Sequence, residues 1–392
     1  MLGVQLKTLS PPEFNINAST FARKLNTTDD LDGVVSHIEK YQEGQSYCIQ
    51  ILGDPGSGCT TFAQAICISL INNEYCTEQQ LLFTRVQPEC NEASVWNLFS
   101  ELAKEKQEKE IASVFSQTSV KLLKKLETLV QFLQLNFKVI CLDDVGCDGL
   151  FVFKLISSAL LRASCKVVIT SSEDIRGTAF IAWEDCCSVH VKGFKEVLLP
   201  DHCTMFSSLS RQSLMSRAKN ILSCNPVAYK VFSNFVNEFS LSVEQAEDQL
   251  DNLERYKLEN QQPFNAVELV LKLLSNWLDQ TEMVSLLQLS QLRQPLPVLK
   301  TQSVSKLARL SLLTIRESKQ NNAMVVYFVT MPICIQRYFQ DEFRKNKIKD
   351  DEVKMKEKFD VLQLWLSLLS KELLVLIDNA ESSEWPFVPE KW

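Results

Sequence analysis

The residues with the clearest chemical potential form a glycine-rich loop in the first part of the chain. In order, they are Gly53, Asp54, Pro55, Gly56, Ser57, Gly58, Cys59, Thr60 and Thr61. Glycines let a loop curl until its backbone N–H groups face inward at the start of a helix, where they can hold a polyphosphate. In the complete motif, G-x-x-x-x-G-K-[ST], a lysine reaches the β- and γ-phosphates and a hydroxyl binds magnesium. Thr60 provides the hydroxyl, but Cys59 stands in place of the lysine.

Two interpretations of this loop are open: a phosphate-binding loop, or a glycine turn that joins a strand to a helix without a ligand. The acidic strand end described below favours the first. Loss of the lysine charge removes on the order of a few kcal/mol of attraction for phosphate at an effective dielectric near 20. Phosphoryl transfer should suffer more than binding, because its catalysis is mostly charge stabilisation and positioning. A reactive role for Cys59 at a helix N-terminus is conceivable, but neutral drift explains the cysteine more simply.

Acidic and hydroxyl side chains follow two apolar runs further along the chain. Asp143 and Asp144 come after residues 138–142, where a P-loop site needs one carboxylate for magnesium, shared with Thr60, and often a second to polarise the attacking water. The alternative is a pair of turn or helix-capping aspartates. Thr170 follows residues 166–169 and could place its hydroxyl near the γ-phosphate, or could cap a helix.

The elements that would position these residues alternate between buried strands and helices. Continuous apolar strands separated by helical patterns predict an α/β P-loop NTPase fold, with a parallel sheet and helices on both of its faces. We expect strands at 47–52, 138–142, 166–169 and 188–191, and helices at 60–71, 93–106, 120–135 and 151–162.

A small helical domain and a winged-helix domain are expected after the sheet. The signal is helical from 203 to 256, and later helices at 266–278, 283–289 and 304–310 precede β-like runs at 312–316 and 324–329. We divide the chain into an N-terminal tail (1–20), a P-loop nucleotide-binding domain (21–200), a helical domain (201–262), a winged-helix domain (263–345) and a C-terminal helical segment (346–392).

Composition narrows the functional classes. The 392 residues include 41 basic and 48 acidic side chains, and this acidic balance argues against nucleic acid or anionic lipid as a partner. Thirteen cysteines without a leader sequence indicate reduced thiols in a cytoplasmic protein, and no apolar run reaches the roughly 20 residues of a membrane span. Five side chains are possible zinc ligands, but their spacing matches that of no common zinc finger. They are Cys186, Cys187, His190, His202 and Cys203.

The order of these motifs resembles the NB-ARC class of signal-transduction NTPases, which includes the apoptosome scaffold and plant disease-resistance receptors. The likeness covers about residues 20–345 and rests on the P-loop, on Leu-Asp-Asp-Val at 142–145, on 168–172 and on Asn-Pro-Val-Ala at 225–228. The resemblance implies that Pro226 packs against adenine and that ADP is buried among the three domains in a resting state. It further implies that exchange for ATP allows self-oligomerisation and contacts with other proteins.

The chain departs from that family at several positions besides Cys59. Ser172 stands where the family has an arginine, Arg176 lies too far on to replace it, and no histidine occurs near Met331. We therefore interpret the chain as a degenerate scaffold that binds ADP or ATP weakly or vestigially, with or without magnesium, or binds none. An active ATPase with a compensating basic residue and a winged-helix transcription regulator are the alternatives. The chain is expected to be a bare central module or a fragment of a longer protein.

Overall fold

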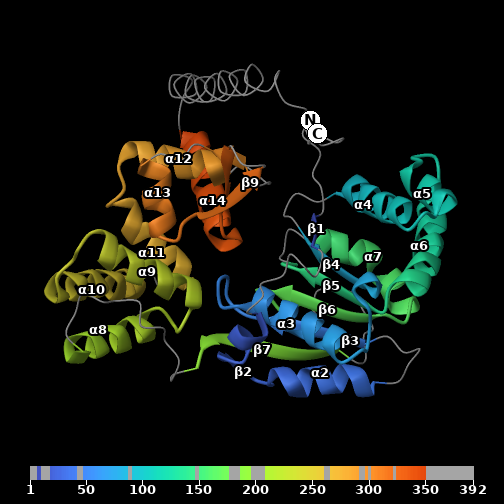
Figure 1. Ribbon diagram of the computed structural model, residues 1–392, viewed down its shortest axis with the longest axis horizontal. Coiled ribbons are helices and arrows are strands. Elements are labelled where there is room, and N and C mark those ends of the chain that lie inside the picture. Colours follow the sequence, from blue (N-terminus) through green and yellow to red (C-terminus); the bar gives the residue numbers. More distant parts are fainter. Residues whose placement is uncertain are drawn as a thin grey trace. The chain divides into compact units, whose positions relative to one another are not determined.

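The computed structural model describes most of the chain, with gaps between the described segments (Figure 1). The described residues are 7–9, 18–41, 47–86, 91–145, 150–175, 186–195, 208–259, 265–290, 296–298, 302–320 and 324–349. They separate into two compact units, one of Met1–Leu278 with Lys300–Ile315 and the other of Asp279–Leu299 with Arg316–Trp392. The P-loop and the residues around it all belong to the first unit.

A seven-stranded sheet organises the first part of the chain, in the order β1-β4-β5-β6-β3-β7-β2. Five strands are mutually parallel: β3 (Tyr47–Leu52), β4 (Leu81–Arg85), β5 (Val139–Asp143), β6 (Lys166–Ser171) and β7 (Cys186–Phe194). The edge strands β1 (Lys7–Leu9) and β2 (Leu25–Thr27) are antiparallel to their neighbours. The predicted α/β sheet is therefore confirmed, but it is mixed rather than wholly parallel, and β1, β2 and β4 were not predicted.

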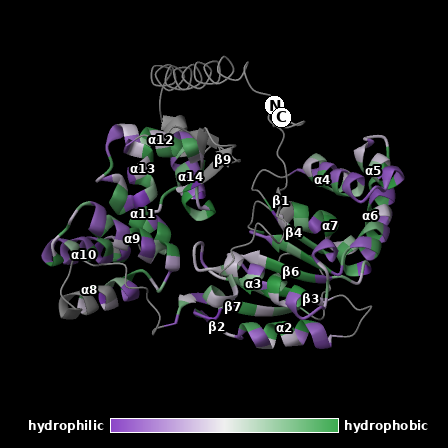
Figure 2. Ribbon diagram, in the orientation of Figure 1, coloured by the Kyte–Doolittle hydropathy of each residue, from purple (hydrophilic) through white to green (hydrophobic). Residues whose placement is uncertain are grey.

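Helices cover both faces of this sheet, as the continuous apolar strands predict. One face packs on α1 (Ala18–Ala22), α2 (Leu31–Lys40) and α3 (Cys59–Asn72). The other packs on α4 (Glu92–Glu105), α5 (Lys109–Ser116), α6 (Leu122–Asn136) and α7 (Leu150–Arg162). Neighbouring residues of one strand face opposite cores: Cys141 packs with α3, whereas Leu142 packs with α4–α7. Figure 2 shows the central strands as mostly hydrophobic.

A group of consecutive helices follows the sheet within the same unit. They are α8 (Ser208–Ile221), α9 (Pro226–Glu238), α10 (Val243–Glu259) and α11 (Ala266–Ser275). Asparagine side chains cap α9 and α11, because Asn225 accepts from the N–H groups of Val227 and Ala228, and Asn265 accepts from Val267. Phe235 of α9 packs edge-on against Trp277, just beyond α11, with ring centroids 5.3 Å apart. These contacts make α9 and α11 one packed pair.

The remaining elements include two of the three predicted helices, at 283–289 and 304–310, and both predicted β-like runs. With a further short strand, these runs form a three-stranded sheet. The remaining elements are α12 (Gln280–Ser290), β8 (Leu296–Val298), α13 (Gln302–Arg309), β9 (Thr314–Gln320), β10 (Met324–Thr330) and α14 (Ile333–Lys349). The strand order is β8-β10-β9. The domain boundaries given above, and the winged-helix assignment itself, stay predictions. No helix in the described part of the chain is long and apolar enough to cross a membrane.

Candidate functional site

The P-loop has the geometry of an anion-binding turn. It connects the end of β3 at Leu52 to the start of α3 at Cys59. Gly56 has φ 83° and Gly58 has φ 112°, conformations that residues with a Cβ rarely adopt. Within the described chain no side chain caps α3. The first turn of a helix leaves its N–H groups without intrahelical partners, so those of Thr60 and Thr61 are suited to an anion placed at the loop.

Cys59 is packed into the loop rather than held above it. Its Sγ lies 3.4 Å from Ser57 Oγ, and a Cβ placed on Gly53 would come within 2.8 Å of the same sulfur. Burial, reinforced by the charges of Asp143 and Asp54, raises the pKa of the Cys59 thiol to about 12, despite an opposing hydrogen bond from Ser57. The thiol is therefore neutral at physiological pH. A nucleophilic or redox-sensing role, which requires a thiolate, is not supported.

Asp143 is the centre of a hydrogen-bonded cluster below the loop. Its side chain is fully buried, and Oδ1 accepts hydrogen bonds from Thr60 Oγ1 at 2.8 Å and from Thr170 Oγ1 at 2.7 Å. One strand, β6, lies between the P-loop strand β3 and the Asp143 strand β5, and Thr170 lies near its end. The structure thus brings together Thr60, Asp143 and Thr170, which are far apart in sequence.

Arg85 completes this cluster and was missed by the sequence interpretation. It is the last residue of β4 and lies opposite Asp143 in the register of the two parallel strands. Its Nε donates to Asp143 Oδ2 at 2.9 Å, and its Nη2 lies at the same distance from that oxygen. Burial would lower the pKa of Arg85, but the charge and hydrogen bond of Asp143 raise it above its usual value. The sequence does contain a signal for strand β4, because an alternation of strands and helices requires a strand between the helices predicted at 60–71 and 93–106.

Asp144 contacts this cluster through its backbone N–H, and Ser172 lies at the surface. Asp144 has a left-handed backbone with φ 68°, and its N–H donates to Thr170 Oγ1 at 2.7 Å. Ser171 forms a local turn in which its hydroxyl donates to the carbonyl of Glu173 at 2.6 Å. Ser172 is exposed, and Arg176 lies outside the described residues. Thr170 therefore donates its hydroxyl hydrogen bond to Asp143 rather than capping a helix.

The predicted Asn-Pro segment reaches the P-loop directly. Asn225 Nδ2 donates to the carbonyl of Pro55 at 3.0 Å, across 170 residues of sequence. A Cβ on Gly56 would lie 2.9 Å from Val267 Cγ2 and 3.0 Å from Asn225 Oδ1, so the loop is packed closely against α9 and α11. Pro226 is buried as the first residue of α9. Its contact with adenine stays a prediction.

The residues present do not fit the magnesium ion that a P-loop fold implies. A carboxylate offers about four lone-pair sites, and the oxygens of Asp143 are contacted by two hydroxyls and two guanidinium nitrogens. While it is paired with Arg85, the side chain is fully buried and out of reach of the water molecules through which it would hold the metal. For zinc, the described residues contain no group of three or more His, Cys, Asp or Glu that could hold a metal ion. His202 and Cys203 lie outside the described residues.

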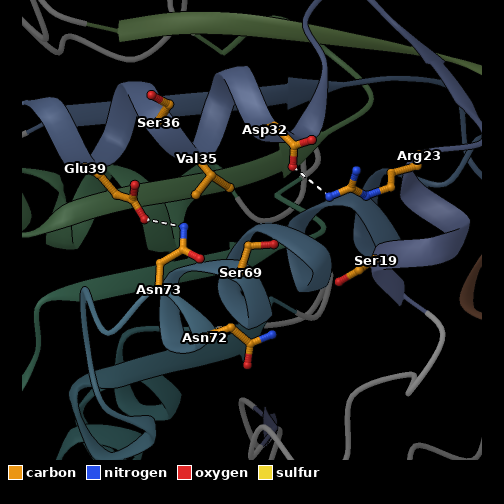
Figure 3. Close-up of a pocket in the computed structure, with 9 residues that line it drawn as sticks. All are labelled: Ser19, Arg23, Asp32, Val35, Ser36, Glu39, Ser69, Asn72 and Asn73. Carbon is orange, nitrogen blue, oxygen red and sulfur yellow. Dashed lines mark hydrogen bonds and ion pairs between the residues drawn. The ribbon is translucent and has the colours of Figure 1, made fainter.

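A separate polar groove of about 310 Å³ lies among α1, α2 and α3 (Figure 3). It is lined near the C-terminal end of α3 by Ser69 and Asn73, and at 1.5 Å of rise per residue this is about 15 Å along the helix from Thr60. Four of its polar side chains pair with one another: Arg23 with Asp32 at 2.8 Å, and Asn73 with Glu39 at 2.7 Å. The groove is thus distinct from the P-loop.

Comparison with known proteins gives distant likenesses only. No protein-family model matches the chain, and no curated protein matches it. Among solved structures, the chain is similar to a Signal Transduction ATPase with Numerous Domains (STAND) protein with a tetratricopeptide repeat sensor from Pyrococcus horikoshii. The identity is 13% and the TM-score 0.43, over 83% of this chain but only 43% of that one.

Two further likenesses are of the same order. A Walker-type ATPase of Pyrococcus abyssi gives 13% identity and a TM-score of 0.34 over 79% of this chain and 95% of that one. Domain III of the Thermotoga maritima replication initiation protein DnaA gives 12% identity and a TM-score of 0.30 over 67% of this chain and 98% of that one. TM-scores this low establish neither a family nor a function, so the chemistry of the site rests on the residues described above.

Proposed function

We propose that this chain is an NB-ARC-like signalling scaffold that binds adenine nucleotide, ADP in preference, weakly or vestigially at residues 53–61. It acts through conformation and protein contacts rather than turnover. The phosphates would lie on the glycine backbone and on the N–H groups at the start of α3, with Thr61 in its first turn and Pro226 beside the base. Gly56 and Gly58, with their positive φ angles, support the phosphate site.

The observation that carries this proposal is the hydrogen bond from Asn225 Nδ2 to the carbonyl of Pro55. It fastens the start of α9 to the loop that would hold the phosphates, and Val267 of α11 packs on the same loop at Gly56. A ligand that alters the loop must therefore act on the α9–α11 pair as well. Differential contacts of this kind are what allow two nucleotides to favour two arrangements of a protein.

Hydrolysis is not favoured by the same geometry. Cys59 brings no charge to the phosphates, and Asp143, the candidate for handling magnesium, is already paired with Arg85. Asp144 would be catalytic only in an active ATPase, and that alternative requires a basic residue free to replace the lysine. Arg85 is basic and near, but its guanidinium is held by Asp143 rather than placed above Cys59. Electrostatic stabilisation of the transferred phosphoryl group is thus weak.

Protein partners, including further copies of this chain in the cytoplasm, fit better than DNA. A winged helix that reads DNA would present basic side chains from α13. Arg309 of α13 instead makes two 2.7 Å hydrogen bonds to Glu238 of α9, and Lys306 lies 5.0 Å from the ring centroid of Phe239. Because both cations contact the neighbouring helix, the transcription-regulator alternative is not favoured.

A thermal-shift titration with ADP, ATP and GDP, run beside a phosphate-release assay, tests this proposal. We expect saturable stabilisation by the adenine nucleotides, a smaller effect of GDP, and no phosphate released from ATP above the buffer rate. A protein that no nucleotide stabilises would contradict nucleotide binding. Turnover that disappears in Asp143→Asn would instead support the active ATPase.

A further inference from the structure

The pairing of Arg85 with Asp143 changes what the site can bind. Asp143 lies beside Thr60 of the P-loop, where a divalent cation would be expected to bridge the protein and the phosphates. The Arg85 guanidinium contacts the other carboxylate oxygen at 2.9 Å through both Nε and Nη2. A buried carboxylate must be neutralised by some partner, and here a protein cation already does so.

Electrostatics then oppose a metal ion at this place. Magnesium retains most of its water and is usually held through carboxylates that are accessible to those waters. The Asp143 side chain has no accessible surface, and its charge is balanced by Arg85. A divalent ion approaching Thr60 would meet an ion pair without net charge rather than a free Asp143 carboxylate, so Asp143 would attract it only weakly.

The same guanidinium is suited to a phosphate. Arginine carries five N–H donors in a planar fork, and the Nε and Nη2 contacts to Asp143 leave further N–H groups on Nη1 and Nη2. The Arg85 side chain is 27% exposed, so part of it reaches the surface although Asp143 does not. It belongs to the same carboxyl-terminal edge of the sheet as the P-loop, because β3 and β4 run parallel to the intervening β5 and β6.

We propose that Arg85 takes the place of the metal, so that adenine nucleotide binds this site without a divalent cation and with Arg85 as the cationic partner of its phosphates. The proposal rests on the proposed function, since it requires that nucleotide binds at residues 53–61. Arg85 does not replace the lysine that Cys59 lacks. It replaces the magnesium ion, which in a complete P-loop site binds beside the lysine.

Titration of a fluorescent ADP analogue, in excess magnesium and in EDTA, provides the test. For the unmodified chain we expect the two dissociation constants to agree within about twofold, because no metal contributes to binding. For Arg85→Gln we expect binding in EDTA to weaken by about tenfold or more, as for loss of a hydrogen bond to a charged group. Magnesium should restore part of it, because Asp143 is then free to hold a cation.

Two further variants guard against a loss of folding in Arg85→Gln. Arg85→Lys keeps the charge and should retain magnesium-independent binding. The double variant Arg85→Gln with Asp143→Asn removes both charges and avoids an uncompensated buried carboxylate. It should bind the analogue weakly, and magnesium should not restore binding.

The outcomes separate this inference from the function on which it rests. If EDTA weakens ADP binding to the unmodified chain by about tenfold or more, the nucleotide site stands and the role of Arg85 is wrong. Unchanged binding by Arg85→Gln in EDTA would overturn it equally. If the unmodified chain binds the analogue in neither condition, the proposed function itself fails.

Discussion

The link between Asn225 and the P-loop can be tested by a change that separates its two roles. Asn225 caps α9 by accepting from two backbone N–H groups, and it donates from Nδ2 to the Pro55 carbonyl at 3.0 Å. Aspartate is as good a helix cap as asparagine but has no N–H to donate. The substitution Asn225→Asp therefore keeps the cap and removes the bond to Pro55.

The expected cost follows from burial. Asn225 is 3% exposed, and a buried acceptor left without its donor costs about 1–3 kcal/mol. The new carboxylate gains about 0.5 kcal/mol from the N-terminus of α9. Burial of the new charge opposes this gain, so we expect the free energy of unfolding to fall by at least about 1.5 kcal/mol, which is roughly a tenfold change or more in the equilibrium constant.

Asn265 offers a matched control at the start of α11. It accepts from the N–H of Val267, and its amide nitrogen has no hydrogen bond to another described residue. Asn265→Asp should change the free energy of unfolding by less than about 0.5 kcal/mol. Urea denaturation followed by far-UV circular dichroism, with equal slopes for all variants, measures both values. Equal losses for the two variants, or no loss for Asn225→Asp, would refute the bridging role.

Three further predictions concern charge. Because the pKa of Cys59 is raised to about 12 from 9.0, its thiolate fraction at pH 7.5 should be about a thousandfold lower in the folded chain than in urea. Peptide-mapped alkylation of Cys59 should therefore be slower in the folded chain by a factor of that order, and its rate should still rise with pH above 9. Equal rates in the two states would contradict a protonated thiol. Cys59→Lys should tighten ADP binding by about tenfold in calorimetry without restoring phosphate release from ATP, because Asp143 remains paired with Arg85; a gain in turnover would count against that pairing. Finally, Arg309 lowers the pKa of Glu238 through its hydrogen bonds, so the stability from this pair is present at neutral pH and is lost as the pH falls below the usual glutamate range. Since Arg309 is largely exposed, Arg309→Ala should cost up to about 1 kcal/mol at pH 7 and progressively less as the pH falls below the usual glutamate range, and a pH-independent cost would assign the loss to packing.

The central strands could be predicted because each is a continuous apolar run between helical patterns. Strand β3 agrees with the prediction at both ends, and β6 begins where predicted but extends to Ser171. Strand β4 was missed because its apolar part is short and ends in Thr84 and Arg85. The edge strands β1 and β2 have three residues each, too few to show a pattern.

The site was predictable only in part, for a related reason. Motif spacing identified Gly58, Thr60 and Asp143, since these types recur in phosphate sites. The Arg85–Asp143 pair arises from the register of two neighbouring strands, and no local pattern specifies register between segments 58 residues apart. The contact of Asn225 with Pro55 likewise depends on how α9 packs on the loop, so the sequence motif gave the asparagine no role.

One calorimetric measurement tests the proposed function most directly: titration of ADP into the unmodified chain, with phosphate release from ATP followed on the same preparation. The proposed function predicts saturable binding with a dissociation constant on the order of 10⁻⁵–10⁻³ M, as expected for a phosphate site without its lysine. It also predicts no release of phosphate above the buffer rate. Absence of binding would contradict a nucleotide site at residues 53–61. Release of phosphate that is abolished by Asp143→Asn would contradict a scaffold without turnover.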